Sequence, residues 1–269
     1  MVKLYEKIAW FLSIILTVSI IFYAFHVTAP PKRAAVTNTT ILSEGKILLP
    51  LPQKVSKLTV EESILLRRSI RDYKDDPINI VDLAMILWAA YGITEPTRGF
   101  RASPSAGATY PLEIYVVAGE RGVLIKDGVL KAGVYKYEPN SHTLLLIGEG
   151  DRRTNLREAA LGQEWVGEAP ISLVICAVFE RTTAVYGERG KTRYVPMEAG
   201  HAGQNIYLIA TALGYSVVVV GAFHDDSVSR VINAKPEEKP LYIVPIGVPK
   251  IPSYLSFEDI WEYIESRRG

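Results

Sequence analysis

The first feature of the chain is an uninterrupted apolar run near its start. Residues 8–27 contain no Asp, Glu, Lys or Arg, and about 20 apolar residues are enough to cross a bilayer as a helix. We therefore predict that residues 1–29 form a single-pass membrane anchor, with Trp10 and Tyr23 at the two interfaces. A cleaved signal peptide is the alternative, because small residues end the run, but Pro30 follows them directly and should resist a peptidase.

The charges that flank this run do not fix its orientation. Lys3 and Lys7 precede it, and Lys32 and Arg33 follow it, so the positive-inside count is nearly balanced. The side of the membrane on which the remaining chain lies therefore stays open. Residues 30–58 are rich in Pro, Thr, Ser and Lys with little periodicity, which predicts a tether or an extended arm.

Helical and strand-like patterns alternate beyond the tether. Thr59 and Glu62 have capping-box spacing and begin a helix predicted to end at Arg68. Asn79 can cap a second helix, which Gly92 ends. The other predicted elements are strands at 112–118, 171–178, 217–220 and 241–246, a hairpin of 129–138 and 143–147, and a helix at 198–213. Strands and helices mix without a regular βαβ repeat, which predicts an α+β fold.

Composition and charge narrow the function classes. The chain has 30 Lys and Arg against 29 Asp and Glu, a net charge of +1, so it offers no electrostatic footprint for nucleic acid. Cys176 is the single cysteine, which excludes a disulfide framework within the chain and a Cys-rich metal site. The four histidines are scattered, and we predict no metal site. The folded domain is predicted over 59–250, followed by a helical tail at 251–269.

One segment is similar to part of a nucleotide-binding loop but lacks its spacing. Gly187 to Thr192 reads Gly-Glu-Arg-Gly-Lys-Thr. A phosphate-binding loop needs a glycine five positions before Gly190, where the chain has Val185. No G-x-G-x-x-G follows a predicted strand either, so neither a triphosphate site nor a Rossmann site is indicated.

Arginines cluster at the predicted end of the first soluble helix. Arg67, Arg68 and Arg71 lie within five residues, together with Ser69. Arginine binds phosphate bidentately, and several arginines can converge on one dianion. Cations near a helix C-terminus are favourable in any protein, so a solvated basic cap is the alternative.

Three further segments combine small residues with polar groups. Residues 103–111 (Ser-Pro-Ser-Ala-Gly-Ala-Thr-Tyr-Pro) precede a strand and would let a ligand lie close to the backbone. Residues 198–205 (Glu-Ala-Gly-His-Ala-Gly-Gln-Asn) place two glycines inside a helix, at a cost of about 1 kcal/mol each. Close packing within the subunit or against a second subunit would offset that cost. Gly221 ends the predicted strand at 217–220.

Taken in order, these segments resemble the nitroreductase superfamily of flavin enzymes. The pattern is Arg-Arg-Ser-x-Arg-x-Tyr at 67–73, Pro-Ser-Ala-Gly-Ala-x-Tyr-Pro at 104–111, Glu-Ala-Gly-His-x-x-Gln-Asn at 198–205 and Pro-Ile-Gly-x-Pro at 245–249. The second and third segments point to the SagB-type branch, some members of which oxidise peptide azolines. The resemblance covers about residues 59–250.

This resemblance implies an α+β sandwich in which helices flank a central, mainly antiparallel sheet. It further implies an intertwined homodimer with one FMN per subunit at the interface. The implied phosphate ligands are Arg67, Arg68, Ser69 and, with less weight, Lys250. Arg71 would face the pyrimidine edge of the flavin, Ser103, Pro104, Ser105, Ala106 and Gly107 would lie along its rings, and Gly221 and Ala222 would offer backbone groups near N5.

The implied activity is that of a membrane-anchored, FMN-dependent oxidoreductase. It would transfer hydride or electrons between NADH or NADPH and an acceptor through flavin N5. Arg71 is one catalytic candidate, because a cation near N1 and the C2 oxygen favours the anionic reduced flavin. The other is Tyr194.

Two positions depart from the SagB-type pattern. Azoline-oxidising members have a Lys-Tyr pair that handles protons, whereas the nearest equivalent here is Arg193-Tyr194, and arginine stays protonated. His224 stands where the branch usually has an acidic residue. The alternatives are therefore an oxidase that acts on a modified peptide rather than a small molecule, and a flavin-binding module without turnover.

Overall fold

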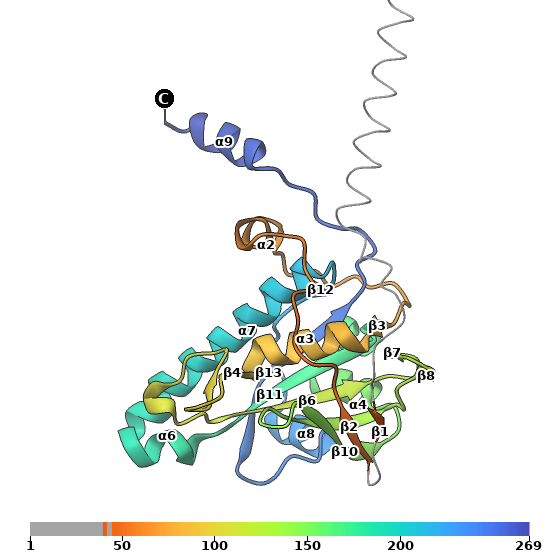
Figure 1. The fold of residues 1–269 in the computed structure, drawn as a ribbon, viewed down its shortest axis with the longest axis vertical. Coiled ribbons are helices and arrows are strands. Elements are labelled where there is room, and N and C mark those ends of the chain that lie inside the picture. The colour runs from red at the N-terminus through yellow and green to blue at the C-terminus, as the bar shows by residue number, and fades with distance from the viewer. Residues whose placement is uncertain (1–39, 42–44, 269) are drawn as a thin grey trace, which may run out of the picture.

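An eight-stranded antiparallel sheet carries the fold (Figure 1). The computed structural model of the chain describes residues 40–41 and 45–268. The strands lie in the order β1-β2-β10-β9-β6-β11-β13-β12. Their bounds are β1 Thr40–Ile41, β2 Lys46–Leu48, β6 Leu112–Ala118, β9 Gly133–Glu138, β10 Thr143–Glu149, β11 Ile171–Val178, β12 Ser216–Val217 and β13 Glu238–Gly247. The predicted α+β class with a central antiparallel sheet is thus confirmed.

Two layers of helices cover the two faces of this sheet. Helices α3 and α7 pack on one face, and α4, α5 and α8 pack on the other. Their bounds are α3 Ile80–Tyr91, α7 Val195–Ala212, α4 Arg153–Ala159, α5 Glu164–Glu168 and α8 Asp225–Val231. All eight residues of β11 are buried between the layers, which explains why this strand reads as one continuous apolar run. Cys176 lies within it as a core residue.

The remaining elements are short. Helix α2 packs on α7, and α6 and a π-helical turn, η3, lead into α7. Their bounds are α2 Val60–Leu66, α6 Phe179–Tyr186 and η3 Gly190–Tyr194, with a 3-10 turn η2 at Ala106–Ala108 and helix α9 at Phe257–Glu265. Two small sheets are formed by β3 Ile78–Asn79, β7 Val123–Ile125 and β8 Gly128–Val129, and by β4 Ile93–Glu95 and β5 Phe100–Arg101.

Local capping explains why the helix bounds follow the sequence. The Asn79 side chain accepts a 2.9 Å hydrogen bond from the Val81 amide, and α3 ends before Gly92, as predicted. Helix α7 begins three residues earlier than expected, because Pro196 lies in its first turn. Proline is tolerated there because the N–H that it lacks would have no partner within the helix.

Two predicted segments differ in the structure. The strand expected at 217–220 is paired as β12 only at Ser216–Val217, with one isolated bridge from Val220 to Ile243. Between them, the Val219 amide donates to the Tyr207 hydroxyl at 3.0 Å instead of to β13. Part of the expected tether also belongs to the sheet, since β1 pairs with β2 and β2 pairs with β10.

The predicted membrane localisation is corrected. In residues 40–41 and 45–268, no helix is both long and apolar enough to span a bilayer. The longest helix of that part, α7, has 18 residues and carries Glu198, His201, Gln204 and Asn205. The expected anchor, residues 1–29, lies outside the described residues.

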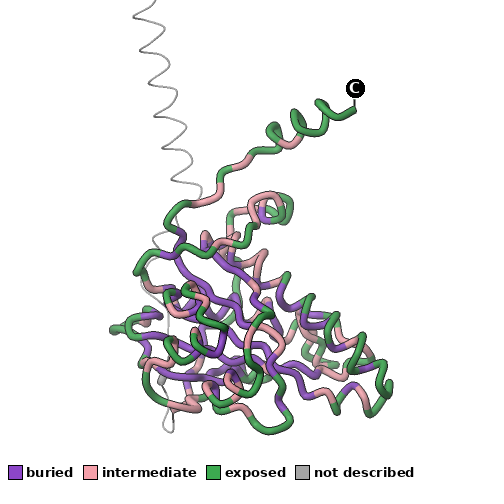
Figure 2. The backbone as a smooth tube through the Cα atoms, turned by 180° about the vertical axis from the view of Figure 1, so that it is seen from behind, coloured by how far each residue is buried: buried purple, intermediate pink, exposed green. Residues whose placement is uncertain are grey.

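Helix α9 projects away from the body of the subunit (Figures 1 and 2). Ser256 and Asp259 form a capping box at its start, so its sequence favours a helix. Yet no residue of α9 is buried, and Trp261 on its apolar face is 57% exposed. This apolar face is therefore not covered by the described part of the same subunit.

A buried ionic cluster joins three strands on the sheet face beneath α4 and α8. The Lys136 ammonium lies 2.6 Å from Glu238 and 3.0 Å from Glu113. Tyr115 donates to Glu238, and Arg181 donates to Glu113. Burial alone would raise the pKa of Glu238, but the hydrogen bonds from Lys136 and Tyr115 outweigh it and leave that pKa below its ordinary value.

We expect Lys136→Ala to destabilise the protein by about 3–5 kcal/mol, because it leaves the buried Glu238 carboxylate without a cation, whereas Glu113 keeps Arg181. Urea unfolding measures this loss. Lys131→Ala is the matched control: Lys131 pairs with Glu149 at 2.7 Å, but both side chains are more than 60% exposed, so the expected cost is below about 1 kcal/mol. Equal losses in the free energy of unfolding for the two variants would show that burial does not determine the contribution of these ion pairs to stability.

Candidate functional site

The predicted arginine cluster begins at the C-cap of helix α2 and continues on an extended segment. Helix α2 begins at the Thr59 capping box and ends at Leu66, and Arg67 already has ψ 123°. The segment then runs beside the sheet, where Ser69 bridges Val217 and Tyr73 bridges Pro249. Successive side chains of an extended segment point to opposite sides, so the cluster is expected to divide into two sets.

The contacts show this division. Arg67 lies over the Tyr207 ring at 5.1 Å, and the Ser69 hydroxyl shares a 2.7 Å hydrogen bond with the Tyr207 hydroxyl. Arg71 lies over the Trp165 ring at 5.3 Å. Arg68 instead donates to the carbonyl oxygens of Leu65 and Arg67 and lines a cavity of about 40 Å³. Arg67, Ser69 and Arg71 therefore form one polar surface, from which Arg68 is separate.

The turn after β12 completes this surface. Gly221 and Ala222 are exposed, and the Gln163 side chain donates to the Ala222 carbonyl at 2.8 Å. Gln163 is close in sequence to Trp165, so α5 fixes both the turn and the ring beside Arg71. Lys250 is also exposed, and its amide donates to the Asp72 carbonyl at 3.3 Å. We call the surface formed by Arg67, Ser69, Arg71, Trp165, Tyr207, Gly221 and Ala222 the arginine surface.

The Trp165 indole carries an unusual donor. Its Nε1 is buried and has no hydrogen-bond partner in the part of the chain that the structure describes. A buried donor without a partner is costly and calls for an explanation. Because this indole lies beside the Arg71 guanidinium, a ligand with acceptor atoms at the arginine surface would provide one.

The small-residue loop at 103–110 is a second surface, which we call the loop surface. The Ser103 hydroxyl is buried and donates to the Ala90 carbonyl at 2.8 Å. Gly107, Ala108 and Tyr110 all have positive φ, of 59°, 52° and 46°. The left-handed conformation costs a residue with a side chain about 1–2 kcal/mol, so other contacts must hold the loop in place.

Two tyrosines from the α6–η3 segment lie beside this loop. A Cβ added to Gly107 would meet the Tyr186 hydroxyl at 2.7 Å, which places that phenol directly against the loop. The predicted catalytic Tyr194 packs its ring edge-on against Tyr186, with centroids 4.9 Å apart. Arg193 is exposed. The catalytic role of Tyr194 stays a prediction, while the phenol that contacts the loop glycine is that of Tyr186.

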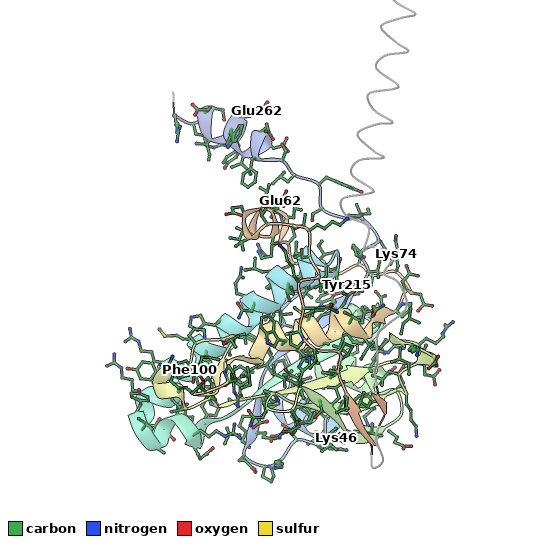
Figure 3. The ribbon with its side chains drawn as sticks, in the orientation of Figure 1. Lys46, Glu62, Lys74, Phe100, Tyr215 and Glu262 are labelled. Carbon is green, nitrogen blue, oxygen red and sulfur yellow. The ribbon has the colours of Figure 1, made fainter. Side chains whose placement is uncertain are left out.

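The two surfaces lie on opposite sides of α7. Asn205 donates to the Ala89 carbonyl and to the Ser103 hydroxyl on one side, whereas Tyr207 faces Arg67 and Ser69 on the other. At 3.6 residues per turn, side chains two positions apart point in nearly opposite directions. In Figure 3, Phe100 lies near one end of α7 and Tyr215 near the other. One subunit therefore does not bring all the predicted site residues together.

The two helix glycines serve different purposes. A Cβ on Gly203 would lie 3.6 Å from Val219 and 3.8 Å from Tyr242, so this glycine lets α7 approach the sheet within the subunit. A Cβ on Gly200 would meet nothing within 4 Å. The close-packing interpretation thus accounts for Gly203 and leaves Gly200 available on the surface.

A family comparison decides the class of this protein. The sequence model described as "Nitroreductase family" matches residues 64–248, well over half of the chain. The protein belongs to the nitroreductase family. The Methanocaldococcus jannaschii protein MJ1384, which carries the name nitroreductase, is 45% identical over 194 residues, covering 72% of this chain and 92% of its own.

Other relatives of this nitroreductase carry names that refer to microcin B17 and trifolitoxin. The microcin B17-processing protein McbC of Escherichia coli is 27% identical over 157 residues, covering 58% of this chain. The chain spans only 57% of the length of McbC and of the trifolitoxin operon protein TfxC of Rhizobium leguminosarum.

A solved nitroreductase structure from Ralstonia eutropha matches with a TM-score of 0.66 and 26% identity. It covers 81% of this chain and 97% of its own. The match therefore extends over nearly the whole of that structure.

Sequence reasoning missed Trp165, Gln163, Tyr186 and Tyr207. Tyr186 precedes Gly187, a helix stop with positive φ, and that signal could have revealed the end of α6. Tyr207 occupies a helical position whose period gives no hint of a polar partner. Trp165 lies in a five-residue helix and Gln163 is its N-cap residue, and such a helix is too short for periodicity to detect.

We expect Gly107→Ala to destabilise the protein by about 1 kcal/mol more than Gly99→Ala. Both glycines have positive φ, so both variants carry the left-handed cost, but only Gly107 faces Tyr186, and Gly99 has open space. Thermal unfolding of the two variants provides the comparison. Tyr186→Phe removes the nearest atom and should recover most of the difference, and no recovery would show that the contact is not the cause.

Proposed function

We propose that this nitroreductase-family protein is an FMN-dependent oxidoreductase that transfers electrons between a reduced nicotinamide and an acceptor. The observation that carries the proposal is the placement of Arg67, Ser69 and Arg71 on one side of an extended segment. This surface combines two cations, a hydroxyl, an indole donor without a partner and an exposed glycine turn.

The arginine surface fits the two ends of a flavin mononucleotide. Arg67 and Ser69 supply a guanidinium and a hydroxyl, both of which suit a phosphate dianion. Arg71 and the Trp165 Nε1 donor would face carbonyl and ring-nitrogen acceptors. The exposed backbone at Gly221 and Ala222 would contact the ring, and Lys250 would add a cation. The Arg68 guanidinium donates to backbone carbonyls. We therefore assign Arg68 a smaller contribution to phosphate binding than the sequence analysis gave it.

When bound, FMN supplies the hydride chemistry at its N5 atom. The residues of the chain bind and orient the ring and tune its charge. Arg71 would lie at the pyrimidine edge, where its cation would stabilise negative charge on the reduced ring. Tyr186 and Tyr194 form the aromatic wall beside Gly107, where a nicotinamide or an acceptor would enter.

We further propose a homodimer in which each site uses both subunits. The arginine surface of one subunit would face the loop surface of the other, because the two lie on opposite sides of α7 in a single chain. The uncovered apolar face of α9 supports a partner subunit as well. Twofold symmetry would then build two equivalent sites.

A second candidate is the oxidation of a modified peptide. The similarity to McbC and TfxC favours it, and the exposed surroundings of Tyr186 and Val185 leave room for a large substrate. Arg193 in place of a lysine base weighs against it. Consumption of NADH or NADPH without any peptide, followed by reoxidation with an added acceptor, favours the first candidate. It would also exclude a binding module without turnover.

We expect Arg67→Ala to weaken FMN binding by about 10- to 100-fold, because a charged hydrogen bond to phosphate is worth about 1.5–3 kcal/mol. Arg68→Ala should change the affinity by less than about threefold, since its guanidinium faces the other side. Flavin fluorescence quenching on titration of the flavin-free protein measures both dissociation constants. The reverse order of effects would contradict the assignment of the arginine surface.

Subunit complementation tests the shared site. Arg67→Ala damages the arginine surface, and Gly107→Val damages the loop surface, so each homodimer should bind little FMN. After the two variants are mixed and subunits exchange, half of the dimers are heterodimers with one intact site, which predicts about one FMN per four chains. Circular dichroism of each variant confirms folding. If the mixture binds no more flavin than the separate variants, the site is not shared.

A further inference from the structure

The buried Glu198 carboxylate of α7 accepts hydrogen bonds from side chains that support the loop surface. Glu198 is 2% exposed, and the Tyr91 hydroxyl donates to it at 2.5 Å. The Ser105 hydroxyl hydrogen-bonds to the same carboxylate. A carboxylate accepts without donating, so it can serve two hydroxyl donors at once.

Each of these hydroxyls in turn holds the backbone of the loop. The Ser105 oxygen accepts from the Tyr110 amide at 2.9 Å, and the Tyr91 oxygen accepts from the Leu112 amide at 3.1 Å. Tyr110, at the end of the left-handed turn at 107–110, is thus connected to Glu198 through Ser105, and Leu112 is connected to it through Tyr91. A single carboxylate therefore fixes both the turn and the start of β6.

Arg101 also contacts the tyrosines around Glu198. Arg101 lies between the rings of Tyr91 and Tyr110, 4.4 Å and 4.7 Å from their centroids, and its amide donates to the Tyr110 hydroxyl at 3.3 Å. The charged groups that act on Glu198 are Arg101 and His201. Burial raises the pKa of Glu198, and the hydrogen bonds from Ser105 and Tyr91 offset this only in part.

We propose that Glu198 is a positioning residue, which fixes the conformation of residues 103–110 so that this loop can contact a flavin ring. The inference rests on the proposed FMN site for its functional consequence, but the bracing of the loop stands on the contacts of the chain alone. A residue that only packed α7 against α3 would need no carboxylate at this position, because burying a charge is costly.

The test compares Glu198→Ala and Glu198→Gln with Glu188→Gln, an exposed control between α6 and α7. The first readout is hydrogen exchange in the flavin-free protein. In Glu198→Ala we expect the Tyr110 and Leu112 amides to exchange at least about tenfold faster, since each loses the group that orders its acceptor. Amides of β11 should exchange as in the unchanged protein, which shows that the fold is intact.

The second readout is FMN affinity between pH 5 and 8. Glu198→Ala should raise the dissociation constant about tenfold or more. Glu198→Gln keeps one acceptor oxygen but loses the second, as protonation of Glu198 does, so it should recover only part of the affinity. The affinity of the unchanged protein should fall toward acid pH as Glu198 takes up a proton, and this acid limb should be missing in Glu198→Gln.

The outcomes separate the two proposals. If the unchanged protein binds no FMN, the proposed function fails, and hydrogen exchange still decides whether Glu198 braces the loop. Unaltered exchange at Tyr110 and Leu112 in Glu198→Ala would overturn the inference, as would faster exchange without any loss of FMN affinity. If Glu198→Ala does not fold, Ser105→Ala removes only the tether to Tyr110 and must accelerate exchange at that amide more than at Leu112.

Discussion

The structure of the site depends on one hydroxyl group, that of Tyr207. It accepts from the Val219 amide at 3.0 Å and shares a 2.7 Å hydrogen bond with Ser69. Helix α7, the segment after α2 and the strand that leads to Gly221 therefore meet at one atom. Arg67 lies over the same ring. The proposed phosphate ligands and the glycine turn keep their relative positions because this phenol joins them.

Helix α7 also keeps the arginine surface and the loop surface apart. Its Tyr207 side holds the arginine surface, and its Glu198 and Asn205 positions hold the loop surface. A helix about 10 Å wide cannot bring two such opposite faces to one ligand. The proposed second subunit would bring the two surfaces to one ligand, and the exposed apolar face of α9 is compatible with it.

Much of the fold could be predicted from the sequence, because strong local signals agreed with the tertiary structure. The Asn79 cap and Gly92 marked the two ends of α3, and the apolar run of β11 indicated a buried strand. The site was less predictable. Candidate ligand residues could be named from their motifs, but the separation of Arg68 from Arg67 requires knowing that the chain is extended after Leu66. Trp165 and Tyr207 owe their positions to packing, which leaves no pattern in the sequence.

A crystal structure of the full chain grown with FMN tests the central claim most directly. The account predicts the phosphate against Arg67 and Ser69 of one subunit, with the ring between Arg71 of that subunit and residues 105–107 of its partner. A flavin bound elsewhere, or one held by both surfaces of a single chain, would contradict it.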